Sequence, residues 1–111
     1  MATGSDDSKT RDAVTPVDYP SLSKSKRRAV REQYVAEQGG CCAYCSAPLD
    51  ERPVKIEADH PITARQWDAF PGGREGFLAN PVHLDHDHGT GLTRGAVHAY
   101  CNAVQWLRWR R

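Results

Sequence analysis

Long hydrophobic runs are missing from this sequence of 111 residues. None approaches the roughly 20 apolar residues that a membrane-spanning helix needs. The polar, acidic stretch after Met1 lacks the apolar centre of a secretory signal peptide. No internal repeat is visible, which argues against a repeat architecture. These absences predict a protein that has no membrane partner and stays in the cytoplasm.

Apolar residues are also scarce at the start of the chain. Residues 1–20 carry several aspartates among Ser, Thr and Pro, and they offer almost nothing to bury. We therefore predict a disordered acidic tail over residues 1–20 and one small folded domain over residues 21–111. The core of so small a domain is thin, so a bound metal would add to its stability.

The formal net charge of +1 hides an uneven distribution. Behind the acidic tail comes a basic segment that contains Lys24, Lys26, Arg27, Arg28 and Arg31. A basic face beside a near-neutral body suits an anionic partner such as nucleic acid. The alternative is a solvated helix face, which the charge pattern favours when it is taken alone. The candidate DNA-binding residues of this segment are Lys24, Arg27, Arg28 and Arg31.

Hydrophobic periodicity and turn residues predict a mixed α+β domain. A helix is expected over residues 21–40, with Ser21 or Ser23 as its N-cap and with Gly39 and Gly40 as its stop. Alternating apolar and polar residues predict three short strands, at residues 54–60, 81–88 and 92–97. Further expected elements are one or two helical turns over 63–70, a loop over 71–76 and a terminal helix over 102–111.

The cysteines are expected to bind metal rather than to form disulfides, because the expected compartment is reducing. Cys42 and Cys45 form a CxxC motif, and His98 and Cys101 form an HxxC motif. Two such pairs on knuckle-like turns suit tetrahedral zinc, and four protein ligands would make this zinc structural. Cys41 is a rival ligand, but Cys42 fits the usual turn better. A redox CxxC and buried free cysteines are the alternatives.

A second group of metal-capable residues is left once the zinc ligands are assigned. Strand alternation puts Asp85 and Asp87 on one side of the chain, with His86 and His88 on the other. If the terminal helix packs across a two-stranded hairpin, Asn102 faces Asp85 across a small gap. Carboxylate and amide oxygens suit Mg²⁺ or a similar ion. His86 could deprotonate a water for attack on a phosphodiester.

The order of these motifs resembles the recombination endonuclease VII branch of the HNH (ββα-metal, His-Me finger) nucleases. In that branch a CxxC precedes a DHDH run, a TG turn, an RG, a second ligand pair and an Asn. The matching residues here are Cys42 to Cys45, Asp85 to His88, Thr90-Gly91, Arg94-Gly95, His98 to Cys101 and Asn102. The resemblance covers about residues 22–105. It implies a small zinc-stapled ββα-metal domain with an N-terminal helix, in which residues 46–81 are an inserted segment.

The resemblance also implies a role for each matching residue. Asp85 and Asn102 would bind the catalytic divalent ion, Mg²⁺ or Mn²⁺, and His86 would be the general base. His88 would contact or polarise the scissile phosphate, and His83 would have a supporting role. The zinc ligands would be Cys42, Cys45, His98 and Cys101.

The inserted segment contains a rival for the catalytic pair. A strand that ends in Asp59-His60, followed by Gly72-Gly73 and then Asn80, looks like the general HNH pattern. Asp59 and His60 could therefore be catalytic in place of the DHDH run. Otherwise they would form the polar end of an inserted hairpin.

Three arginines are candidates for phosphate contacts. Arg94 is the best of them, because its RG sits beside the proposed catalytic metal. Arg65 and Arg74 are interpreted more simply as surface charge.

The leading interpretation is a metal-dependent endonuclease that hydrolyses phosphodiester bonds in DNA. The resemblance suggests a phage-type role in the host cell cytoplasm. The competing class is a non-catalytic zinc-knuckle protein that binds nucleic acid. A zinc knuckle explains the cysteines equally well, but it has no need of the DHDH run or of Asn102. A monomer with one active site would nick DNA, whereas a weak homodimer could cut both strands.

Overall fold

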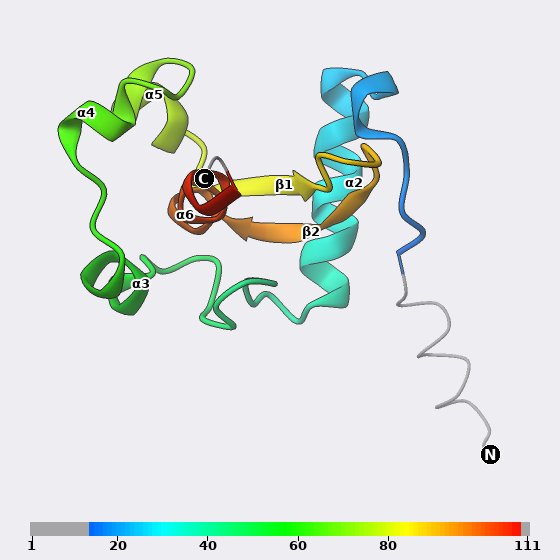
Figure 1. The fold of residues 1–111 in the computed structure, drawn as a ribbon. Coiled ribbons are helices and arrows are strands. Elements are labelled where there is room, and N and C mark those ends of the chain that lie inside the picture. Colours follow the sequence, from blue (N-terminus) through cyan, green and yellow to red (C-terminus); the bar gives the residue numbers. More distant parts are fainter. Residues whose placement is uncertain (1–13, 110–111) are drawn as a thin grey trace.

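The computed structural model describes residues 14–109, and of Trp109 only the backbone. These residues form a small α+β fold in which a two-stranded antiparallel sheet lies between α2 and α6 (Figure 1). The elements are, in chain order, the 3-10 turn η1 (Tyr19–Ser21), α2 (Lys24–Glu37), α3 (Val54–Asp59), α4 (Ala64–Trp67), α5 (Gly73–Leu78), β1 (Val82–His86), β2 (Thr93–His98) and α6 (Ala99–Trp109). The expected α+β class is confirmed, as is a hairpin followed directly by a helix.

The hairpin of β1 and β2 contains an irregularity at its turn end. Asp85 pairs with Gly95, but the register then shifts so that His86 pairs with Thr93. Arg94 is the extra residue of this β-bulge. Because a bulge redirects the side chains of the bulged strand, Arg94 leaves the place opposite His86 and contacts Asp85 instead.

Asp87 closes the turn between the two strands. Its Oδ1 accepts hydrogen bonds from the backbone N–H groups of Gly89 and Thr90, at 2.7 and 2.9 Å. These bonds, that from Thr90 first, lower the pKa of Asp87. Its backbone carbonyl accepts a further hydrogen bond from Gly91 N at 2.7 Å. Asp87 is thus a turn residue that orders the loop between the strands.

The helix α2 begins and ends where turn chemistry predicted. Ser23 is its N-cap and accepts a hydrogen bond from Lys26 N at 3.2 Å. Gly39 and Gly40 follow the helix with φ values of 66° and 79°, which glycine adopts without steric cost. Tyr34 is buried against the hairpin, and the expected serine cap and glycine stop are both confirmed.

Gln38, just after α2, hydrogen-bonds to the backbone of β2. Its Oε1 accepts from Ala96 N at 2.8 Å, and its Nε2 donates to Ala96 O at 2.9 Å and to Cys41 O at 2.7 Å. The side-chain amide therefore satisfies backbone groups of β2 as a neighbouring strand would.

Two hydrophobic clusters make up the core. The first lies between α2, the hairpin and the cysteine turn, and its buried members are Tyr34, Cys42, Leu49, Leu84, Ala96, Val97 and Cys101. The second is built around Trp67, Phe70 and Ala103, with further aromatic rings packed against it. Cys101 and Ala103 of α6 belong to different clusters, so α6 joins the inserted segment to the hairpin.

Residues 14–20 pack against the hairpin, although the sequence predicted a tail over residues 1–20. Thr93 N donates to Val17 O at 2.9 Å, and Tyr19 N donates to Gly91 O at 2.8 Å. Val14 and Tyr19 also pack against the first cluster. These few apolar residues were enough to fold the end of the predicted tail. Residues 1–13 lie outside the described part of the chain.

The inserted segment is helical where a strand and a loop were predicted. Residues 54–59 form α3, in which Lys55 and Asp59 make an i,i+4 ion pair at 3.0 Å. Alternation over so short a run fits a helix equally well. Gly72 precedes α5 as its N-cap with φ of 77°, so the glycines start a helix rather than a loop. The prediction of helical turns over 63–70 is confirmed by α4. In Figure 1, α3, α4 and α5 form an arc beside α6, away from α2.

Candidate metal centre and active site

Four side chains from the two predicted ligand pairs come together at the junction of β2 and α6. The potential ligand atoms of Cys42, Cys45, His98 and Cys101 all lie within 4.8 Å of one another. Cys42 and Cys45 are on the turn after α2, His98 ends β2, and Cys101 is in the first turn of α6. The cluster could hold one metal ion, and three sulfurs with one imidazole nitrogen suit zinc.

The imidazole of His98 has the orientation that a metal ligand needs. Its Nε2 donates a hydrogen bond to Pro48 O at 2.8 Å. The other nitrogen, Nδ1, lies 3.5 Å from Cys45 Sγ and 3.6 Å from Cys101 Sγ. A carbonyl that holds one ring nitrogen protonated leaves the other nitrogen with its lone pair toward the metal. The carbonyl of Pro48 is therefore a supporting group that the spacing of the ligands did not reveal.

The sulfur of Cys42 lies among hydrogen-bond donors. Backbone N–H groups of Tyr44, Cys45 and His98 point to it at 3.3, 3.5 and 3.4 Å. A hydrogen bond with Cys101, followed by those from the backbone, lowers the pKa of Cys42 to about 4 against the opposing effect of burial. These donors favour the thiolate, which is the form that binds metal.

Cys41 is not a member of this cluster. Its Sγ points back to Gly39 O at 3.9 Å, and its backbone forms an isolated bridge with Pro48. The preference for Cys42 over Cys41 as the zinc-site residue is consistent with this placement.

Asp85, a predicted ligand of the catalytic ion, is buried and ion-paired. Its Oδ2 accepts from Arg94 Nη2 at 2.8 Å and from Arg94 Nε at 3.1 Å. A buried carboxylate needs such a partner, because burying an unpaired charge is costly. Arg94 was predicted to contact phosphate. In the structure its guanidinium pairs with the carboxylate of Asp85 and neutralises that charge.

Asn102 is held by His83 rather than by Asp85. Asn102 Nδ2 lies 3.1 Å from His83 Nδ1, and His83 Nε2 lies 3.0 Å from Phe77 O. A carbonyl only accepts, so His83 Nε2 carries the proton and Nδ1 accepts from Asn102. Burial lowers the pKa of His83, which favours this neutral ring. The amide oxygen of Asn102 is then left as its acceptor group.

The two faces of β1 contact different helices. Leu84 packs with Tyr34 of α2, whereas His83 contacts Asn102 of α6. Strand alternation puts Asp85 on the same face as His83, and the charge of Asp85 is close enough to oppose the lowering of the His83 pKa by burial. Within residues 14–109, no hydrogen bond joins Asp85 directly to Asn102.

His86, the predicted general base, lies in a stack of aromatic rings. Its ring is 4.1 Å from that of Tyr19 with an interplanar angle of 6°, and 5.0 Å from that of His88 with an angle of 3°. Burial and the neighbouring His88 lower the pKa of His86, whereas Asp85 acts in the opposite direction. Tyr19 was missed because the sequence assigned it to the tail.

The predicted DNA-binding residues of α2 do not behave alike. Arg27 stacks on Tyr19, with its Cζ 4.1 Å from the ring centroid. The charge of Arg31 is near enough to His83 to contribute, after burial, to lowering its pKa. Arg28 instead forms an exposed i,i+4 ion pair with Glu32 at 3.4 Å. Two basic residues one turn apart on α2 thus lie near the candidate site, while Lys24 and Lys26 are exposed at the start of the helix.

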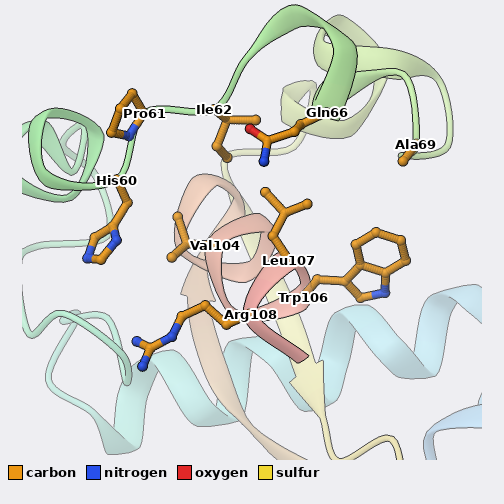
Figure 2. Close-up of a pocket in the computed structure, with 9 residues that line it drawn as sticks. All are labelled: His60, Pro61, Ile62, Gln66, Ala69, Val104, Trp106, Leu107 and Arg108. Carbon is orange, nitrogen blue, oxygen red and sulfur yellow. The ribbon is translucent and has the colours of Figure 1, made fainter. Parts of the chain in front are cut away.

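The rival pair Asp59 and His60 is in a different setting. Asp59 ends α3 and pairs with Lys55, and His60 O accepts a hydrogen bond from Tyr100 OH at 2.8 Å. His60 lies at the edge of an apolar groove in which Ile62 faces Leu107 of α6 (Figure 2). No carboxylate is among the nine described residues that line this groove. The strand that the general HNH pattern requires before the pair is absent, because residues 54–59 are helical.

The two other arginines that were considered, Arg65 and Arg74, lie on exposed positions of α4 and α5. No helix in residues 14–109 has the length and apolar character needed to cross a membrane. Comparison of the chain with protein-family models, with curated proteins and with solved structures gave no match.

Proposed function

We propose that this protein is a metal-dependent endonuclease of the HNH type, which hydrolyses phosphodiester bonds in DNA. The observation that carries the proposal is the hairpin that bears Asp85 and His86 beside a helix that bears Asn102, with a Cys3His cluster at their junction. A cluster of this kind anchors α6 to β2. It therefore fixes the part of α6 that follows Cys101, which is where Asn102 lies.

The residues present fit a catalytic Mg²⁺ or Mn²⁺. Asp85 offers a carboxylate and Asn102 an amide oxygen, both of them hard donors that suit such ions. The amide nitrogen of Asn102 is engaged with His83, and this contact selects the oxygen for a cation. A divalent ion bound there would stabilise negative charge on the scissile phosphate and on the leaving oxygen.

The other residues of the site have roles that the chain itself can perform. His86 accepts the proton of the attacking water as the general base. His88 is next to it in the stack and contacts the scissile phosphate. Arg94 is partly exposed, and its guanidinium is close enough to Asp85 to contact both that carboxylate and a neighbouring phosphate. Arg27 and Arg31, together with Lys24, Lys26 and Arg28 elsewhere on α2, attract the DNA backbone.

The second candidate is a zinc-knuckle protein that binds nucleic acid without cleaving it. Two contacts favour it: Arg94 already neutralises Asp85, and His83 already engages Asn102. A binding module needs no further cation at these positions. The nuclease explains more of the chain, because binding alone gives no reason for an Asp-His pair beside an Asn.

A plasmid-nicking assay distinguishes the two candidates. We expect the wild type to nick supercoiled DNA when Mg²⁺ or Mn²⁺ is added, and to stop when the ion is simply omitted. Omission is preferable to chelation, which would also remove zinc. His86→Ala should abolish nicking with unchanged zinc content and far-UV spectrum, whereas His60→Ala should retain it. DNA retention without cleavage by the wild type would support the binding module, and loss of activity only in His60→Ala would support the rival pair.

A further inference from the structure

The rings of Tyr19 and His88 both stack on the ring of His86, with centroid distances of 4.1 and 5.0 Å. The three rings are nearly parallel, with interplanar angles of 6° and 3°. Arg27 adds a fourth layer, since its guanidinium carbon is 4.1 Å from the centroid of the Tyr19 ring. A tyrosine from the N-terminal segment therefore stacks directly on the histidine proposed as the general base.

Backbone contacts hold Tyr19 in place from both sides. Tyr19 N donates to Gly91 O at 2.8 Å, and Thr93 N donates to Val17 O at 2.9 Å. Val17 N in turn donates to Thr93 Oγ1 at 3.0 Å, and Asp18 forms an isolated bridge with Leu92. The segment is thus attached to the turn and to the start of β2, close to the strand end that carries His86.

We propose that Tyr19 is a positioning residue for His86, which rests on the endonuclease function proposed above. A stacked imidazole cannot swing its plane without losing contact with the rings stacked on it, so its nitrogen-bearing edge keeps one direction. A general base needs a fixed direction, because proton transfer requires a lone pair within hydrogen-bond reach of the attacking water. Tyr19 supplies this constraint without contacting the substrate.

Three variants of the full chain separate stacking from general support of the fold. Tyr19→Ala removes the ring, and Tyr19→Phe keeps a ring that can stack on His86 and lie under Arg27. Val14→Ala is the matched control, because Val14 packs against the same core from the same segment, while its backbone N–H donates to Glu37 rather than to the histidine stack. The charged groups around His86 are Asp85, His88, Arg94 and Arg27, and all remain in each variant.

Steady-state cleavage kinetics give the first readout. We expect Tyr19→Ala to lower kcat by roughly tenfold with KM within about twofold of the wild type. Tyr19→Phe and Val14→Ala should both stay within about twofold in kcat. An unchanged kcat in Tyr19→Ala would overturn the proposal, and so would an equal loss in Val14→Ala, which would mean that the segment only supports the fold.

NMR of the histidine ring protons gives a second readout that does not depend on cleavage. Stacking on the Tyr19 ring should shift the His86 ring protons upfield; Tyr19→Ala should remove this contribution and leave only that of His88, whereas Tyr19→Phe should keep it. Ring protons that do not move in Tyr19→Ala would overturn the stacking, even if nicking is intact. If the shift is lost as expected but the wild type cleaves no DNA, the endonuclease function fails, and the catalytic role of Tyr19 fails with it while the stacking itself stands.

Discussion

Removal of the metal from the Cys3His cluster is expected to unfold the domain. His98, Cys42 and Cys101 are only 2%, 3% and 0% exposed, so three of the four candidate ligands are buried, and two of them, Cys42 and Cys101, are members of the first hydrophobic cluster. The same four residues link three parts of the chain: the turn after α2, the end of β2 and the start of α6. Loss of the ion would release α6 from the hairpin and leave polar side chains buried.

The expected magnitude follows from comparing two free energies. Structural zinc contributes about 10–16 kcal/mol in small metal-dependent domains, whereas a whole domain is stable by only about 5–15 kcal/mol. The first cluster has seven buried members, and two of them are the zinc-site residues Cys42 and Cys101. The part of the core that is independent of the metal is therefore small, and the metal-free protein should have no cooperative unfolding transition at 25 °C.

The assay is thermal unfolding followed by far-UV circular dichroism, with zinc measured in the same samples. We expect one zinc per chain, and loss of the transition either with a strong chelator or in Cys42→Ser. Cys41→Ser is the matched control, because Cys41 is next in the chain but outside the cluster, and its free energy of unfolding should change by less than about 0.5 kcal/mol. A metal-free protein that melts cooperatively within about 5 °C of the wild type would refute this reasoning, as would equal losses in the two serine variants.

Three further predictions concern stability and are measured by urea unfolding. Gln38→Leu should lower the free energy of unfolding by about 2–3 kcal/mol, because it removes three hydrogen bonds to backbone atoms. The control Gln33→Leu, on the exposed face of α2, should lower it little. Equal losses in the two variants would contradict the role given to the Gln38 amide. Gly72→Ala should lower the free energy of unfolding more than Gly39→Ala does. Both glycines have positive φ, but only at Gly72 would a Cβ lie 2.9 Å from a backbone atom, Gly76 Cα. A larger loss in Gly39→Ala would contradict this geometry. Tyr34→Phe should cost about 1–2 kcal/mol through loss of the buried 2.9 Å hydrogen bond with Thr93, and a neutral result would mean that water replaces the hydroxyl.

The four residues of the Cys3His cluster and the hairpin could be predicted from the sequence, because the sequence patterns that indicate them are local. A CxxC fixes two ligands on one turn, and the HxxC fixes two more across the start of α6. Alternation in β1 and β2, the serine cap and the paired glycines identified the elements that carry them. Folding then brings these two local motifs together at the junction of β2 and α6.

The contacts around the candidate catalytic residues could not be predicted in the same way, because they join residues far apart in the chain or depend on an irregularity. The pair of Asp85 and Arg94 depends on a bulge that strand alternation does not reveal. Tyr19 is in a polar segment whose composition predicts no fold, yet backbone hydrogen bonds to β2 hold it over His86. In the inserted segment, short alternation and glycines are compatible with a helix as well as with a strand or loop, and packing against α6 decided the outcome.

The inserted segment also contributes to the candidate site, through His83. The ring of Phe77 packs edge-on against His83 at 4.7 Å, and the carbonyl of Phe77 holds His83 Nε2 at 3.0 Å. His83 in turn holds the amide of Asn102. Phe77 is packed into the second cluster with Trp67 and Phe70, so the aromatic core of the insertion determines where a carbonyl next to the site lies. The cysteine cluster fixes the backbone of α6 at Cys101, but it leaves the side chain of the next residue free to rotate. The second core removes that freedom through Phe77 and His83, so the segment over residues 46–81 orients the amide of Asn102 beside the candidate site.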